Sequence, residues 1–251
     1  MRPGHAAIVL LCAAGCREIL GLDTPVLGAS DGGSGDGPHA DSRWPVFDGG
    51  ARVVGTAATT SAGSSFLTLT LGAPSAGDLI AVAVSWAQSS LPVTSVTDSG
   101  GSTYVELADH AGAAGQLEVF YAANIPGNPL ANTVMIQLPS PVAVLAVAVE
   151  FSGLATTDPV DAQTGEIGGS GAIDSGTIST THAPDLLVGF MSAEGSVSPD
   201  PRYATVVETA NHLLLMENVE VGATGVYDAG ATSANGGLSW AAEVAAFKVG
   251  N

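Results

Sequence analysis

The sequence predicts an all-β protein: an antiparallel β-sandwich of jelly-roll or Greek-key type, folded as a single domain over residues 51–251. Three observations lead to this class. Apolar and small residues alternate in short runs, Gly, Pro, Asn and Asp separate the runs, and two runs are apolar throughout. Alternation is typical of strands with one wet face, and continuous apolar runs are typical of central strands covered on both faces.

Individual runs support the strand prediction. Residues 67–71 alternate Leu and Thr, whereas residues 79–84 and 142–149 are apolar throughout. A helix over residues 142–150 is the alternative, but its Val content favours a strand. The predicted strands are 52–57, 65–71, 79–87, 93–97, 104–108, 116–122, 133–138, 143–151, 177–181, 186–192, 204–208, 213–219, 223–227 and 238–249.

A weak internal repeat divides the domain into two similar halves. Gly77-Asp78-Leu79-Ile80-Ala81-Val82 is echoed 107 residues later by Pro184-Asp185-Leu186-Leu187-Val188-Gly189. Ala146-Val147-Ala148-Val149-Glu150-Phe151 is echoed 96 residues later by Ala242-Glu243-Val244-Ala245-Ala246-Phe247. Two Greek keys that share one sandwich are the preferred interpretation, and two separate small sandwiches are the alternative. The whole texture resembles the jelly-roll-like β-sandwiches of secreted bacterial proteins.

The first residues have the order of an export signal. Met1-Arg2 begins the chain, residues 6–14 are apolar, and small residues precede Cys16. The segment Ala13-Ala14-Gly15-Cys16 resembles a bacterial lipobox, although Ala13 stands where the family usually has Leu. The resemblance implies that residues 1–15 are a signal peptide and that Cys16 is the acylated N-terminus of a lipoprotein. An ordinary cleaved signal peptide and a buried first helix are the alternatives.

Residues 16–50 are predicted to be the lipid-bearing cysteine and a flexible tether. Gly, Ser, Asp and Pro dominate residues 23–50, and a segment without a sustained apolar period cannot offset its ordering entropy. Arg17 follows the cysteine. Because Asp is absent there, the same resemblance implies sorting to the outer membrane, so the predicted localisation is the cell envelope, with the membrane contacted through the lipid.

The composition is strongly acidic. The net charge is −18, and the predicted domain holds only Arg52, Arg202 and Lys248 as bases. Neutralising phosphates requires a basic surface, so nucleic acid is excluded as a partner.

Calcium is the one cofactor that the acidic residues leave open, because it takes several oxygen ligands from one loop. The densest set is Asp158 and Asp161 followed by Glu166, although the spacing does not match an EF-hand. Solvated surface acidity is the alternative interpretation of these three residues.

Aromatic residues make up only 5% of the chain, so any glycan site is small. Trp86 and Tyr104, near the loop at residues 88–91, are the candidate ligand-binding residues. They lie within or beside predicted strands, where packing in the core is the alternative role.

Two classes of function remain open. The first is a binding or adhesion module, or a structural envelope module, that recognises a glycan or another envelope protein without catalysis. The alternative is a secreted-side, glycan-active hydrolase whose carboxylates meet in space rather than in sequence. The first is favoured because the predicted domain, residues 51–251, has no H-E-x-x-H or G-x-S-x-G motif. Its isolated histidines His110 and His182 are predicted to be solvated loop residues.

Replacing Cys16 with Ser tests the predicted anchor. Two or more acyl chains bind a membrane stably, so the C16S protein is expected to leave the membrane fraction on cell fractionation. An unchanged membrane-bound proportion would place the anchor elsewhere in the chain.

Overall fold

The computed structural model describes residues 50–86, 92–112, 115–169, 171–210, 214–233 and 239–250. Cys16, the predicted signal peptide, the predicted tether up to residue 49, and the loop at 88–91 lie outside the described residues. Strands and loops make up the described ranges, and no helix in them is long and apolar enough to cross a membrane. The predicted all-β sandwich class is confirmed.

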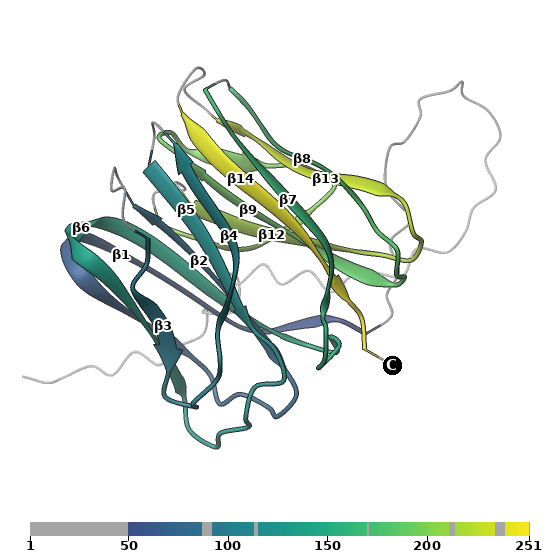
Figure 1. Cartoon of the computed structure of the whole chain (residues 1–251), viewed down its shortest axis with the longest axis horizontal. Coiled ribbons are helices and arrows are strands. Elements are labelled where there is room, and N and C mark those ends of the chain that lie inside the picture. Colours follow the sequence, from purple (N-terminus) through teal and green to yellow (C-terminus); the bar gives the residue numbers. More distant parts are fainter. Residues whose placement is uncertain are drawn as a thin grey trace, which may run out of the picture. The chain divides into compact units, whose positions relative to one another are not determined.

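Fourteen strands make up the described part of the domain (Figure 1). They are β1 (Arg52–Leu71), β2 (Leu79–Trp86), β3 (Ser95–Asp98), β4 (Val105–Gly112), β5 (Gly115–Ala122), β6 (Asn132–Ser152), β7 (Val160–Gly168), β8 (Ala172–Ser179), β9 (Asp185–Ala193), β10 (Val197–Pro199), β11 (Ala204–Glu208), β12 (Leu214–Val221), β13 (Val226–Ser233) and β14 (Trp240–Lys248).

Two pairs of predicted strands turn out to be single long strands. β1 and β6 are 20 and 21 residues long and pair with each other almost throughout. Their register shifts between Ser61 and Phe66, opposite the part of β6 that holds Pro139 and Pro141. The two prolines, which cannot donate a ladder hydrogen bond, lie between the residues of β6 that pair with Phe66 and with Ser64, where the ladder is irregular.

β7 continues to Gly168 and contains Gly165 within the strand. Gly165 lies opposite Glu243 of β14. A Cβ atom on Gly165 would overlap the His110 ring and the Glu243 carboxylate. Glycine is therefore needed here for its small size inside a strand, a role that cannot be distinguished from a turn in the sequence.

The domain consists of two halves with the same strand order. In the N-half (β1–β6) the inner sheet has the order β1-β6-β2-β5-β4, and in the C-half (β7–β14) it has the order β7-β14-β9-β12-β11. Each inner sheet has an outer layer of three strands. It is formed in the N-half by β3 with parts of β6 and β1, and in the C-half by β10-β13-β8.

The register confirms the repeat seen in the sequence. Leu79 pairs with Phe151 in the N-half, and Leu186 pairs with Phe247 in the C-half. The same offsets of 107 and 96 residues therefore relate structurally equivalent positions. We call two such positions counterparts.

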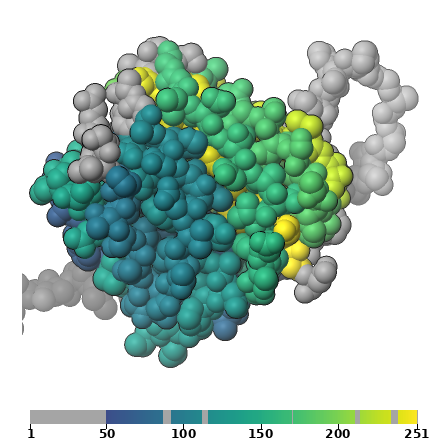
Figure 2. Space-filling model, viewed as in Figure 1, coloured from purple at the N-terminus to yellow at the C-terminus, as the bar shows by residue number. Residues whose placement is uncertain are grey.

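Three apolar cores hold four layers together. On β2, Ile80 and Val82 face the N-half core, between the inner sheet and its outer layer, whereas Leu79 and Ala81 face a central core between the two inner sheets. β9 divides its side chains in the same way, with Leu187 in the C-half core. Each half is therefore a small sandwich with a core of its own. The central core joins the two halves, and residues 42–251 form one compact unit. Figure 2 shows the two halves as adjoining blue-teal and green-yellow parts of one surface.

The chain enters and leaves the described domain at the same end, which we call the proximal end. A Cβ atom on Gly50 would lie 3.4 Å from Val249, and Gly250 donates its N–H to the Gly153 carbonyl at 2.7 Å. β1, β2, β7 and β9 begin here, while β6 and β14 end here, as Figure 1 shows beside the C-terminus. The opposite, distal end holds the β4–β5 hairpin, the β9–β10 connection and the irregular stretches of β1 and β6.

Candidate functional site

A carboxylate at the end of β3 organises one turn of the N-half. Asp98 accepts hydrogen bonds from Asn132 Nδ2 at 2.9 Å, the Tyr104 hydroxyl at 3.1 Å and the Ser102 N–H at 2.9 Å. Burial alone raises the pKa of Asp98, but these donors hold it below its ordinary value. The ionised carboxylate therefore fixes the turn between β3 and β4.

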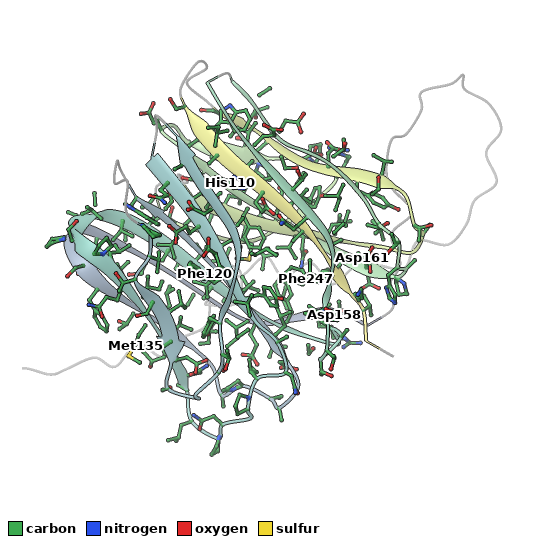
Figure 3. All side chains as sticks on the ribbon, viewed as in Figure 1. His110, Phe120, Met135, Asp158, Asp161 and Phe247 are labelled. Carbon is green, nitrogen blue, oxygen red and sulfur yellow. The ribbon has the colours of Figure 1, made fainter. Side chains whose placement is uncertain are left out.

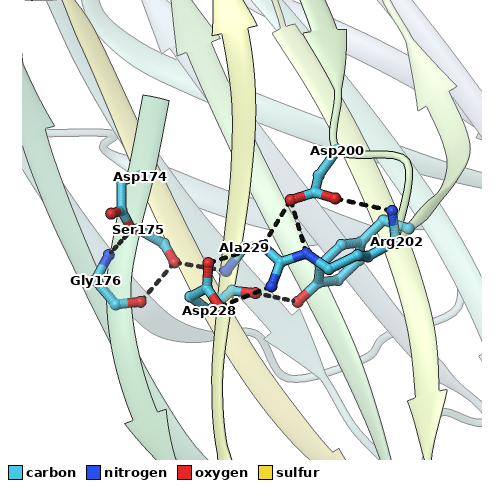
Figure 4. Close-up of polar contacts among 8 residues, drawn as sticks. Asp174, Ser175, Gly176, Asp200, Arg202, Asp228 and Ala229 are labelled. Atoms are coloured by element: carbon cyan, nitrogen blue, oxygen red, sulfur yellow. Dashed lines mark hydrogen bonds and ion pairs between the residues drawn. The ribbon is translucent and has the colours of Figure 1, made fainter. Parts of the chain in front are cut away.

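A second carboxylate cluster lies at the equivalent place in the C-half (Figure 4). Arg202 donates to Asp200 Oδ2 from Nε at 2.9 Å and from Nη2 at 2.6 Å. It also donates to Asp228 Oδ1 at 3.0 Å and to Asp228 Oδ2 at 2.8 Å. The neighbouring Tyr203 hydroxyl donates to the Asp228 carbonyl at 2.8 Å, so this turn is fixed as firmly as the first.

The two clusters differ because the N-half has Asn132 where the C-half has Asp228, 96 residues later. The other carboxylate is shared, since Asp98 is the last residue of β3 and Asp200 directly follows β10. An amide can donate directly to a carboxylate, whereas two carboxylates repel each other and need a cation between them. Arg202 supplies that charge with a bidentate geometry.

Of the calcium candidates, Asp158 lies in the link before β7 and Asp161 lies in β7 (Figure 3), as does Glu166. Asp161 is the extra residue of a register shift against β14, and its carboxylate accepts the Thr181 N–H at 2.5 Å and the Thr181 hydroxyl at 2.6 Å. Asp158 is exposed. Glu166 lies five residues beyond Asp161 on an extended strand, about 16 Å away, whereas ligands of one calcium ion lie within about 5 Å of each other. One ion therefore cannot bind both Asp161 and Glu166.

The structure instead brings Asp161 to Asp185 and His182, which the sequence analysis did not select. His182 Nδ1 lies 2.9 Å from Asp185 Oδ1, and Asp185 is fully buried. Burial and the nearby Asp161 charge raise the pKa of Asp185 to about 6, although His182 lowers it. The signal in the sequence was the repeat itself, because Asp185 is the counterpart of Asp78. Among the described residues, no group of three or more His, Cys, Asp or Glu side chains is arranged to hold a metal ion.

Asp78, the counterpart of Asp185, also belongs to an acid pair, but its partner comes from a different strand. Its partner is Glu150, whose pKa is raised to about 7 by burial and by the hydrogen bond to Asp78, against the Ser75 N–H that lowers it.

The structure does not bring Trp86 and Tyr104 together. Trp86 ends β2 and is buried in the N-half core, opposite Gln116 of β5. Tyr104 is half-buried and precedes Val105, which pairs with Tyr121 of β5. Five residues of β5 separate the two levels, about 17 Å. No exposed aromatic platform is formed by this pair.

One polar contact joins the two halves through the central region. His110 of β4 lies 2.7 Å from Glu243 of β14 through Nε2 and Oε2 (Figure 3). Glu243 is fully buried and the His110 side chain is 18% exposed. Burial raises the pKa of Glu243, and His110 partly offsets the rise. The expectation of a solvated His110 is wrong: it is a strand residue whose partner is 133 positions away, beyond the reach of sequence reasoning.

Comparison of the chain with protein-family models, with curated proteins and with solved structures gave no match.

Two further acids are buried inside the sandwiches. Glu118 of β5 accepts the Val93 N–H at 3.0 Å, and burial raises its pKa to about 7. Glu217 of β12 lies opposite Gly189, and burial and the charge of Asp200 raise its pKa to about 9. Like Asp185 and Glu150, these groups bind protons more tightly in the folded than in the unfolded chain.

The raised pKa values predict that the domain is more stable in mild acid than in mild alkali. Between about pH 4 and pH 9 the folded chain holds more protons than the unfolded chain, so the free energy of unfolding falls as pH rises, by about 1.4 kcal/mol per pKa unit and group. Thermal unfolding at pH 5 and pH 8.5 measures this difference. Glu217→Gln is expected to flatten the profile, and Glu166→Gln, at an exposed position, is expected to leave it unchanged. A higher melting temperature at pH 8.5 would contradict the prediction.

Proposed function

We propose that this chain is a lipid-anchored module of the bacterial cell envelope that binds a glycan or another envelope protein, for adhesion or structure, and carries out no catalysis. The rigid body is the duplicated sandwich, and the loops at its distal end are the binding elements. The outer membrane is its proposed location, with Cys16 as the anchoring residue.

The positions of the two ends of the domain carry the proposal. The chain enters at Gly50, beside Val249 and Gly153, so a tether that runs from Cys16 to residue 50 attaches at the proximal end. An anchored domain would then present its distal end away from the lipid. Loops on a rigid scaffold are the usual place for binding groups, because they vary without disturbing the core.

The polar clusters near the proximal end are consistent with a structural role. Asp98 and Asp200 accept backbone N–H groups of their own turns, and Asp161 of β7 accepts the N–H groups of Thr181 and His182 in the link before β9. The acid pairs Asp78–Glu150 and Asp161–Asp185 lie at the starts of β2 and β9, where they close the proximal end. These groups support the scaffold, and recognition is left to the distal loops.

Matched lysine substitutions at the two ends test the proposal. The non-lipidated Cys16→Ser chain is expected to bind saturably to isolated cell-wall material, to a glycan on an array or to an envelope protein. Ser140→Lys with Ser196→Lys alters exposed residues of the distal end and is expected to weaken this binding at least about tenfold, the size of hot-spot effects.

The control is Thr156→Lys with Thr157→Lys, which adds the same charges to exposed residues of the proximal end. It is expected to leave the binding unchanged. Equal losses in both variants would contradict the distal site, and turnover of a polysaccharide, ester or peptide by the purified chain would overturn the non-catalytic assignment.

A further inference from the structure

The contacts between the two halves are reciprocal. β4 packs on β7 and β14, and its counterpart β11 packs on β1 and β6, the counterparts of β7 and β14. In the same way β5 contacts β14 while β12 contacts β6. When each contact is repeated with the partners exchanged, the interface has the form of a twofold, isologous dimer.

Two serines mark the position of this internal axis. Ser85 pairs with Leu117 in the N-half, and Ser192 pairs with Leu214 in the C-half, so the serines are counterparts at the offset of 107 residues. Their hydroxyl oxygens lie 2.5 Å apart. A residue meets its own counterpart only on a twofold axis, so the axis passes between β2 and β9.

The interface is chemically suited to holding two copies of one fold together. Around the axis the central core is apolar on both sides, with Leu79, Val149 and Phe151 from the N-half and their counterparts Leu186, Ala245 and Phe247 from the C-half. Burial of two similar apolar faces favours association but does not by itself distinguish one half from the other.

His110 and Glu243 break the symmetry. Glu243 lies opposite Phe190, and the equivalent position opposite Ala83 is Val147. His110 lies opposite Leu117, and the equivalent position beside Leu214 is Thr209, whose N–H donates to the Leu214 carbonyl at 3.0 Å.

Each half therefore carries one member of a pair that only the other half completes. If two N-halves paired, His110 would face Val147 and lose its carboxylate acceptor. If two C-halves paired, Glu243 would be buried without its imidazole. A buried polar group without its partner disfavours the wrong complex more than a matched pair favours the right one.

We propose that the inner sheet of each half is a pairing surface for a second copy of the same fold, and that His110–Glu243 commits it to joining an N-half to a C-half. The surface would accept the complementary half of another copy of this chain as well as its own. The inference concerns how the domain is assembled and does not depend on the proposed function.

The test uses the whole folded chain, with a protease site inserted between the exposed residues Thr157 and Asp158 in the link between the halves. After cleavage the two pieces are expected to remain together as a one-to-one complex by native mass spectrometry. Unfolding in denaturant and refolding are expected to restore this mixed pair, with few pairs of like halves. Separation of the pieces on cleavage, or like pairs as abundant as mixed ones, would overturn the proposal.

Variants of the same cleaved chain locate the specificity. His110→Val with Glu243→Val is expected to bring mixed pairs down towards the statistical share of about half of all pairs. His110→Val alone is expected to admit pairs of N-halves but not of C-halves, and Glu243→Val alone is expected to do the reverse. Each variant is compared only if its uncleaved chain keeps the circular dichroism of the parent. Single variants that retain strictly mixed pairing would contradict the role given to the pair.

Discussion

The packing of the two inner sheets against each other is the interaction on which the rest of the structure depends. Each half has a core of its own, but the inner face of β2, β6, β9 and β14 is apolar as well and would meet water in an isolated half. Removing that face from water in both halves at once makes one domain from two small sandwiches, because apolar area buried is the main driving force for association. The four layers, the shared proximal end and the reciprocal contacts all follow from this packing.

The buried acids gain their properties from the same architecture. Four layers leave few polar positions at the surface of the inner sheets, so Glu118, Glu150, Asp185 and Glu217 are enclosed and have raised pKa values. Burial raises the pKa values of Asp98 and Asp200, but hydrogen-bond donors outweigh it and lower both: Asn132, Ser102 and Tyr104 for Asp98, and Arg202 for Asp200. Ionised carboxylates thus hold turns, whereas burial makes Glu118, Glu150, Asp185 and Glu217 bind protons more tightly than they would in the unfolded chain.

The fold class could be predicted from the sequence because the physical pattern is local. The alternation of Leu and Thr in residues 67–71 indicates a strand with one buried face. The continuous apolar run at 79–84 indicates a strand that is buried on both faces. The repeat around Asp78 and Asp185 was also visible, and it proved to relate equivalent strands. One sandwich and two sandwiches were alternatives in the sequence analysis. The structure combines them, because each half is a small sandwich and the two halves also share a central core.

The polar sites could not be predicted in the same way, because their partners are remote in sequence. His110 meets Glu243 only after the two inner sheets pack, and Asp161 meets Asp185 only because a register shift in β7 redirects its side chain. Trp86 and Tyr104 were grouped as aromatic residues near the loop at residues 88–91, but Trp86 lies level with Gln116 of β5, whereas Val105, next to Tyr104, lies level with Tyr121. Gly165 lies inside β7 of the C-half and leaves room for His110 of the N-half, a contact that no local pattern indicates.

A disulfide placed on the internal axis tests the central claim most directly. Ser85→Cys and Ser192→Cys, in a chain whose Cys12 and Cys16 are replaced by Ser, put two sulfur atoms where hydroxyl oxygens now lie 2.5 Å apart, close to a sulfur–sulfur bond of about 2.0 Å. Under mild oxidation the folded chain is predicted to lose both thiols and to remain monomeric, as titration after unfolding would show. A control with Ser85→Cys and Ser179→Cys, on the exposed face of β8, should keep both thiols. Two free thiols in the axial variant would contradict the twofold packing of the halves.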